Sequence, residues 1–187
     1  MIMQQPQQKS ATPIDPRRFR QVMGSFATGV TVITALGADG EVIGLTANAF
    51  SALSIEPPLV LVCLDYGSGS YRQIQQHGAF AVNILSDQQT DVALDFARRG
   101  PDKGAASKCR VSDRSLPLLE QSLAWIECAL DREYEGGDHA ILIGRVLELH
   151  AKDEGSHPLL YYRGRMAAAA AMTASVSHTA LATGAGQ

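Results

Sequence analysis

The sequence predicts a mainly β protein, an antiparallel β-barrel with a few α-helices packed against its outside. Short segments rich in β-branched and apolar residues recur along the chain, and several are separated by glycine-containing turns that favour antiparallel strands. Helical signals mark only two or three segments. A length of 187 residues suits one domain, and a hydrophobic content of 45% supplies a core for it. We expect one folded domain without internal repeats.

Composition and charge argue against several classes of function. The formal net charge is −3 and no Lys or Arg cluster stands out, so the basic surface that nucleic acid needs is missing. The N-terminus lacks the apolar core of a signal peptide, and no stretch approaches the roughly 18 apolar residues of a membrane span. We therefore expect a cytoplasmic location. Cys63, Cys109 and Cys128 form no CxxC pair and are expected to be small buried side chains, with no metal site.

The first part of the domain predicts a helix and then a hairpin. Asp15 before Pro16 places a capping residue ahead of a proline at the first helical position. The apolar residues that follow have the spacing of one helical face, and we expect this stripe to be core: Phe19, Val22, Met23 and Phe26. Segments 30–35 and 42–50 are predicted strands, because Asp39-Gly40 between them favours a tight turn.

The middle of the chain predicts alternating strands and helices. An apolar run after Pro57-Pro58 favours a strand buried on both faces. The expected elements are a strand at 59–64, a helix at about 71–77, a strand at 80–85 and a helix opened by Ser86. Ser86 and Gln89 form a capping-box pattern for that helix, which carries Val92 and Phe96 on one face. The polar segment 102–117 predicts a loop with little regular structure.

Antiparallel strands return near the C-terminus. Segments 124–133 and 138–149 are predicted strands with a turn at Gly136-Gly137, and a short strand is expected at 159–163. The predicted domain therefore spans residues 14–165. Residues 1–13, rich in Gln and Pro, are expected to be a flexible N-terminus, and residues 166–187 an Ala/Ser/Thr-rich tail.

The sharpest chemical feature is the segment from Asp65 to Tyr71, where a strand end passes through glycines and serines into a helix start. Free backbone amides, the hydroxyls of Ser68 and Ser70 and the helix dipole converge there, and such a spot binds an anion. An ordinary loop with a serine cap is the competing interpretation.

Two further segments carry polar groups that a ligand could use. Within residues 44–51, Thr46, Asn48 and Ser51 supply donors and acceptors, while small neighbours leave room for a flat ring. The Gly136-Gly137-Asp138-His139 turn presents a carboxylate and an imidazole at the head of a strand. Strand residues that face solvent and a structural histidine are the competing interpretations.

Several common catalytic signatures are absent from the sequence. There is no GxGxxG after a strand, no GxxxxGK[ST], no GxSxG and no HExxH. These absences weigh against Rossmann, P-loop, hydrolase and zincin enzymes.

Taken together, the segments resemble the flavin reductase family whose members serve two-component monooxygenases, over about residues 15–165. The residues that carry the resemblance are Met23 to Thr34, Gly44 to Phe50, Pro57-Pro58-Leu59, Phe80 to Leu85 and Gly137-Asp138-His139. Each is common singly, but their order and spacing are specific. The resemblance implies a six-stranded split barrel, usually a homodimer, with the flavin in a groove near the dimer interface.

The resemblance also implies roles for individual residues. Gly44, Leu45, Thr46, Asn48 and Ala49 would contact the isoalloxazine ring and ribityl chain. Cys63, Leu64 and Asp65, with Gly69 and Ser70, would hold the phosphate end. Phe96 and Ala97 would form a wall from a helix that closes over the flavin. His139 and the segment Tyr161, Tyr162, Arg163 and Gly164 would meet the nicotinamide nucleotide.

This resemblance implies hydride transfer from NADH or NADPH to FMN or FAD, and delivery of reduced flavin to a separate monooxygenase. Because the two cofactors carry that chemistry, the protein mainly positions their rings, and His139 is expected to be a positioning residue. The Gly-Ser-Gly-Ser segment replaces bulkier or basic residues near the phosphate, which leaves FMN and FAD both open. A non-enzymatic flavin-binding protein and a relative of pyridoxamine-phosphate oxidase are the alternatives.

Overall fold

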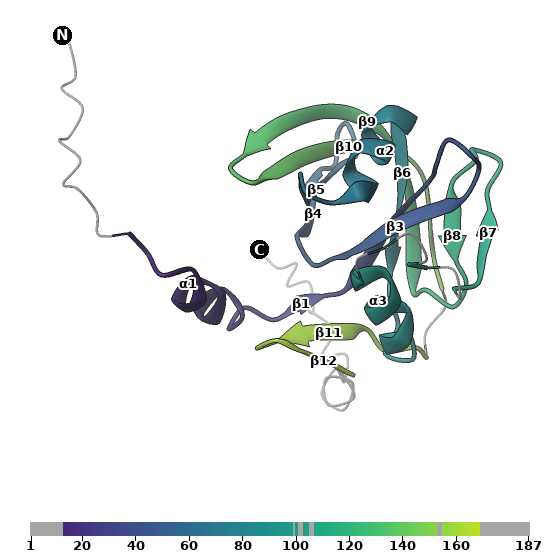
Figure 1. Ribbon diagram of the computed structural model, residues 1–187. Helices are drawn as coiled ribbons and strands as arrows, with labels where there is room; N and C mark the ends of the chain where they lie inside the picture. Colours follow the sequence, from purple (N-terminus) through teal and green to yellow (C-terminus); the bar gives the residue numbers. More distant parts are fainter. Residues whose placement is uncertain (1–12, 99, 101–102, 105–106, 153–154, 169–187) are drawn as a thin grey trace, which may run out of the picture.

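The computed structural model describes residues 13–98, 100, 103–104, 107–152 and 155–168. Within them the chain is mainly β with three helices, as predicted: α1 (Pro16–Met23), α2 (Gly69–His77) and α3 (Thr90–Ala97) (Figure 1). The strands are β1 (Thr28–Gly29), β2 (Thr31–Leu36), β3 (Val42–Ala47), β4 (Phe50–Ser54), β5 (Leu59–Asp65), β6 (Ala79–Ile84), β7 (Cys109–Val111), β8 (Pro117–Leu119), β9 (Ala124–Gly136), β10 (His139–Ala151), β11 (Leu159–Tyr162) and β12 (Arg165–Ala168).

Seven strands form the main sheet, in the order β3-β2-β6-β9-β10-β5-β4, and every pairing in it is antiparallel. Among the described residues no hydrogen-bonded ladder joins its edge strands β3 and β4, so the expected count of six barrel strands is not confirmed. Two smaller sheets accompany it, one of three strands in the order β1-β11-β12 and one of the two strands β7 and β8.

Local signals in the sequence account for several element ends. Asp15 Oδ1 accepts a hydrogen bond from Arg17 N at 3.0 Å and caps α1. Gly40 takes a φ of +78° in the β2–β3 turn and Gly137 takes +75° between β9 and β10, a region that side chains disfavour. Ser86 N donates to Gln89 Oε1 at 3.0 Å, which is one half of the predicted capping box, although α3 itself begins at Thr90.

The core lies between the main sheet and the helices α2 and α3. One cluster of buried side chains joins β2, β5, β6 and β10 to α2, and includes Ile33, Leu64, Ile74 and Phe80. A second cluster lies under α3 and includes Val32, Leu85, Phe96 and Leu159. Both helices therefore have fixed positions against the sheet.

Four sequence predictions about elements are wrong, and the first three concern α1, segment 42–50 and β5. The apolar stripe of α1 is not core: no residue of α1 is buried, and the helix lies at the edge of the molecule beyond β1 (Figure 1). Segment 42–50 is not one continuous strand, since Asn48 and Ala49 separate β3 from β4. Strand β5 buries only alternate residues, because one of its faces is half-open.

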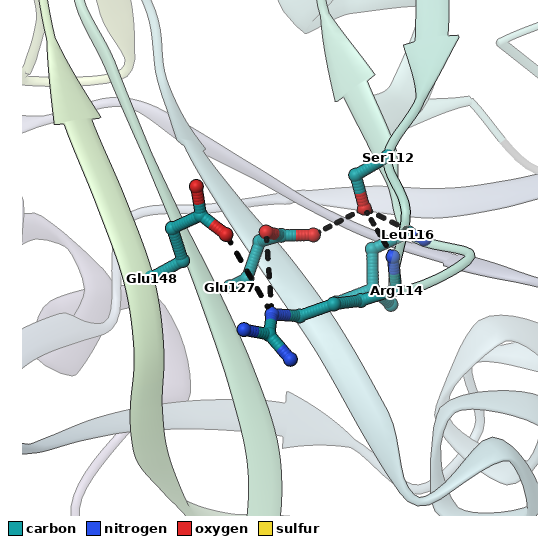
Figure 2. Close-up of polar contacts among 5 residues, drawn as sticks. All are labelled: Ser112, Arg114, Leu116, Glu127 and Glu148. Carbon is teal, nitrogen blue, oxygen red and sulfur yellow. Dashed lines mark hydrogen bonds and ion pairs between the residues drawn. The ribbon is translucent and has the colours of Figure 1, made fainter.

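The segment expected to be a loop at 102–117 instead contributes β7 and the start of β8. Its hairpin is held to the main sheet by a buried carboxylate, that of Glu127 in β9, which is 1% exposed (Figure 2). Ser112 Oγ donates to Glu127 Oε1, and Arg114 Nε lies 3.9 Å from Glu127 Oε2 and 3.7 Å from Glu148 Oε2. These polar contacts add to the burial of Leu116 and Leu118, which pack against Ala81 of β6 in a small apolar cluster.

The chain ends mostly lie outside the described residues: the predicted flexible N-terminus, except for residue 13, and the tail beyond β12. In the part of the chain that the structure describes, no helix is long and apolar enough to cross a membrane.

Candidate functional site

A groove of about 670 Å³ lies between β3, the β5–α2 loop and α3. Elements far apart in the sequence therefore meet at one site. Eight of the residues predicted for a cofactor site line it: Leu45, Thr46, Asp65, Ser68, Gly69, Ser70, Phe96 and Ala97.

Strand β3 forms the floor of the groove and is tied to both helices. Ser70 Oγ donates to Gly44 O at 2.8 Å, and Thr46 Oγ1 donates to Ala93 O at 2.6 Å. A Cβ on Gly44 would lie 2.8 Å from Ile33 O and 2.8 Å from Phe96 Cε1. Only glycine therefore lets Phe96 approach the strand this closely. Both hydroxyl protons are used to hold helices, which leaves Ser70 and Thr46 as acceptors toward the groove.

The β5–α2 loop, for which the sequence predicts anion binding, lines one end of the groove. Asp65 Oδ1 accepts a hydrogen bond from Gly67 N at 2.7 Å and closes the turn before the helix. The side chain of Ser68 does not cap α2, and the space beside the Cα of Gly69 is open. The N-terminus of α2, where the dipole has its positive end, therefore lies at the groove, which Ser68, Gly69 and Ser70 line.

Two basic residues at the groove were missed by the sequence reasoning. Arg98, directly after α3, and Lys103 both line it, and burial lowers the pKa of Lys103. Gly104 packs its Cα against the Phe96 ring, which holds Lys103 beside α3. Arg98 follows Phe96-Ala97 directly in the sequence, and that adjacency was the available signal. Lys103 stands in the polar segment 102–117, which carries no signal of contact with α3.

Gln73 of α2 also lines the groove and was not predicted. Its Oε1 atom is buried and has no hydrogen-bond partner among the described residues. A buried amide oxygen without a partner is costly, and a donor from a bound ligand would satisfy it.

Four predicted residues lie instead in a second cavity, of about 710 Å³, beside α1: Asn48, Tyr161, Arg163 and Gly164. Arg163 N donates to Gly24 O at 2.8 Å and fixes the β11–β12 turn against the end of α1. The remaining predicted residues line neither of these two cavities in the single chain: Gly44, Ala49, Ser51, Cys63, Leu64, Tyr162 and His139. Leu64 is fully buried in the core, so it supports the loop from beneath.

The Gly-Asp-His turn lies beside the β5–α2 loop, because β10 pairs with β5. His139 is opposite Asp65 in the ladder, and Tyr66 N donates to Asp138 O at 3.2 Å. His139 Nδ1 lies 2.6 Å from Asp138 Oδ1, and this hydrogen bond lowers the pKa of Asp138. The carboxylate thus orients an imidazole whose side chain is 42% exposed.

In the described part of the chain, no three His, Cys, Asp or Glu side chains gather closely enough to hold a metal ion.

The chain matches the model of the flavin reductase like domain over residues 23–170. It is 45% identical to the reductase subunit HsaB of a flavin-dependent monooxygenase from Rhodococcus jostii (strain RHA1), over 83% of this chain and 79% of that protein.

Solved structures agree with this match. Nitrilotriacetate monooxygenase component B from Mycobacterium thermoresistibile superposes with a TM-score of 0.78 and 42% identity, covering 81% of this chain and 85% of that one. The NADH:FAD oxidoreductase SgcE6 of Streptomyces globisporus C-1027 gives a TM-score of 0.76 and 34% identity, covering 84% and 97%.

Proposed function

Because the chain belongs to the family of flavin reductase-like domains, we propose that the groove between β3, the β5–α2 loop and α3 is its flavin site. The chain is a flavin reductase, an oxidoreductase that uses a nicotinamide nucleotide to reduce flavin for a monooxygenase. The observation that carries the assignment of the site is the meeting, in one groove, of the α2 N-terminus, Arg98, Lys103 and the Phe96 wall.

The residues of the groove fit a flavin nucleotide. The amides at the start of α2, with Arg98 and Lys103, supply donors and positive charge for a phosphate. The apolar atoms of Leu45 and Phe96 offer surface to a ring, and the orphaned Gln73 oxygen can accept a hydrogen bond from a ligand. FMN and FAD both carry a phosphate and the same ring, so the groove suits both.

Flavin supplies the chemistry when bound, because it accepts a hydride from reduced nicotinamide. The chain's own residues bind the flavin, orient it and exclude water from it. The contacts of Gly44 and Thr46 hold α2 and α3 at a fixed separation, which fixes the width of the groove. His139, oriented by Asp138 beside the β5–α2 loop, would bind the nicotinamide nucleotide and position it toward the flavin.

We keep the six-stranded split barrel as the proposed description of the main sheet. Ala47 at the end of β3 pairs with Thr31 of β2, while Ala49 O accepts a hydrogen bond from Cys63 N of β5 at 3.0 Å. The two edges are therefore joined through Asn48 alone. Counted as one bent strand, β3 and β4 turn the seven-stranded order into six.

A homodimer is part of the proposal. Phe19, Val22 and Met23 of α1 are each more than half exposed in the single chain. Phe19 and Met23 also line the cavity that holds Asn48 and Tyr161. A second copy packed on this stripe would bury it and would bring a partner surface to the contacts expected of Tyr161 to Gly164.

We propose one domain over residues 14–165 as the unit that carries out this activity, which agrees with the family match over residues 23–170. Its partner would be a separate monooxygenase that takes up the reduced flavin. The cytoplasm is the proposed location, since the nicotinamide nucleotides that a flavin reductase oxidises are held there.

The direct test is oxidation of NADH and of NADPH by the purified chain with FMN or with FAD, followed by the loss of nicotinamide absorbance. We expect flavin-dependent turnover well above a protein-free control, and the pair with the highest kcat/KM identifies the preferred flavin and nucleotide. Flavin binding without turnover would instead support a non-enzymatic flavin-binding protein.

The role of His139 has its own test, with His139→Ala and Asp138→Asn compared with the unaltered chain. We expect both changes to raise the KM for the nicotinamide nucleotide, and to leave the flavin dissociation constant nearly unchanged. Unaltered nucleotide kinetics in His139→Ala would remove His139 from the site.

A further inference from the structure

A third cavity, of about 270 Å³, lies at the end of the β9–β10 hairpin opposite the Gly-Asp-His turn. We call it the Trp125 cavity, after the residue that pairs across the hairpin with His150. Arg110, Leu118, Leu119, Ser122 and Lys152 line it with Trp125, and it shares no residue with the proposed flavin groove.

Positive charge without a balancing ion pair converges on the Trp125 cavity. The Arg110 guanidinium lies 5.2 Å from the centroid of the Trp125 ring. Within the described residues, neither Arg110 nor Lys152 forms an ion pair with a carboxylate. Glu120 also lines the cavity, so two cationic side chains face one anionic one.

A buried serine hydroxyl also belongs to the Trp125 cavity. Ser122 is only 4% exposed, and its Oγ atom has no hydrogen-bond partner among the described residues. Burying a hydroxyl without a partner is unfavourable, so the position of Ser122 is explained if an acceptor enters the cavity. An anionic group with oxygen atoms would accept the hydrogen bond of Ser122 and pair with Arg110 and Lys152.

The aromatic part of the wall is the pair of Trp125 and His150. The half-buried Trp125 ring stacks on the exposed His150 with centroids 5.5 Å apart and 29° between planes, while Leu118 and Leu119 behind it are almost fully buried. Such a wall favours a planar apolar body over a hydrated inorganic anion.

We propose that the Trp125 cavity binds a small aryl carboxylate. Its carboxylate pairs with Arg110 and Lys152 and accepts the hydrogen bond of Ser122, while its ring lies against the edge of Trp125 and against His150. This is a second ligand site, separate from the proposed reduction of flavin and independent of it.

The chain itself supplies a probe, because Trp125 is its only tryptophan. Benzoate is titrated into the full chain while intrinsic fluorescence is recorded, with flavin content matched between samples by visible absorbance, and heats of binding are measured in parallel. We expect a saturable change with benzoate, and binding about tenfold weaker with the neutral isostere benzamide or with acetate, which has no ring.

Variants locate the site. Arg110→Gln should weaken benzoate binding about tenfold, because it removes a charge-assisted pair. Ser122→Ala should weaken binding while leaving thermal stability equal or higher, since the lost hydroxyl has no hydrogen-bond partner in the described part of the chain. Arg165→Gln, an exposed arginine of β12 outside the cavity, is the matched control and should bind benzoate as the unaltered chain does.

The proposal is overturned if neither fluorescence nor calorimetry detects benzoate binding to the unaltered chain. It is also overturned if benzamide binds as tightly as benzoate, or if Arg110→Gln and Ser122→Ala leave the affinity unchanged. None of these outcomes depends on flavin-dependent turnover, which is measured separately.

Discussion

Single residues at the proposed flavin groove owe their properties to neighbours that are distant in the sequence. Lys103 belongs to a segment without helical or strand signals, yet it lines the groove because Gly104 packs on Phe96. Burial there lowers the pKa of Lys103, so its charge is lost at a lower pH than that of an exposed lysine.

We predict from this that FMN affinity falls with rising pH in the alkaline range. Lys103 binds phosphate only when protonated, and the protonated fraction declines as the pH passes its lowered pKa. Lys103→Gln should weaken FMN binding about tenfold near neutral pH and remove this step, whereas Lys103→Arg should keep the affinity and extend it to higher pH. Riboflavin, which lacks the phosphate, is the control. A step of equal size with riboflavin would contradict the assignment.

Glu127 is a second residue whose role depends on tertiary contacts. Glu127→Ala removes a buried carboxylate that accepts from Ser112 and faces Arg114, and should lower the free energy of unfolding by about 1–3 kcal/mol. Glu148→Ala removes a half-exposed carboxylate from the same arginine and should cost at most about 1 kcal/mol. Urea denaturation of the two variants measures both. Equal losses would mean that the buried contact has no special weight.

Among the elements, β3 and α3 act as a unit because the Phe96 side chain of α3 packs directly on the backbone of β3 at Gly44. The approach requires a residue without a side chain, since Ile33 O and the Phe96 ring occupy the space where a Cβ would lie. The same strand is held to α2 by the Ser70 hydrogen bond. The width of the groove is therefore set by one strand rather than by its loops.

Gly44→Ala should accordingly push Phe96 and α3 away from β3. We expect a loss of about 1–3 kcal/mol in stability and a higher KM for flavin, measured by thermal unfolding and by steady-state kinetics. Gly29→Ala in β1 is the matched control, because no atom lies within 4 Å of the Cβ it would add. If the two variants have the same stability and the same KM, the close packing of α3 does not shape the groove.

At the scale of the whole molecule, the described residues leave the apolar face of α1 uncovered. Every residue of α1 is at least partly exposed, and its stripe lies beside the cavity that holds four of the predicted site residues. Burial of such a stripe against a second copy would stabilise a dimer and complete that cavity.

Val22→Glu should therefore weaken self-association by about tenfold or more, since Val22 is 63% exposed in the single chain and burial of such a side chain contributes roughly 1.5–3 kcal/mol. Size-exclusion chromatography with light scattering measures the change. Val111→Glu, at a valine of β7 that is 54% exposed, should leave the assembly state unchanged. A monomeric unaltered chain would refute the dimer.

Local sequence was sufficient for the mainly β class, for most strands and for their turns. Asp39-Gly40 and Gly136-Gly137 mark hairpins because tight turns need backbone angles that glycine adopts easily, and Asp15 marks the start of α1 because it caps free amides. The segment from Asp65 to Ser70 was predicted to lie at a ligand site for a similar reason, because a strand end, glycines and a helix start are neighbours in the chain. It does line the groove.

Contacts between distant segments could not be obtained in this way. The periodicity of α1 reveals an apolar face but not what covers it, and Arg98 and Lys103 reach the groove only because α3 packs on β3 at Gly44. The separation of Asn48 and Tyr161 from Leu45 and Ser70 likewise follows from the bend between β3 and β4. Neighbouring residues determine turns and helix caps, because these depend on local backbone angles and hydrogen bonds. The residues that line a cavity depend on the packing of the whole sheet and its helices.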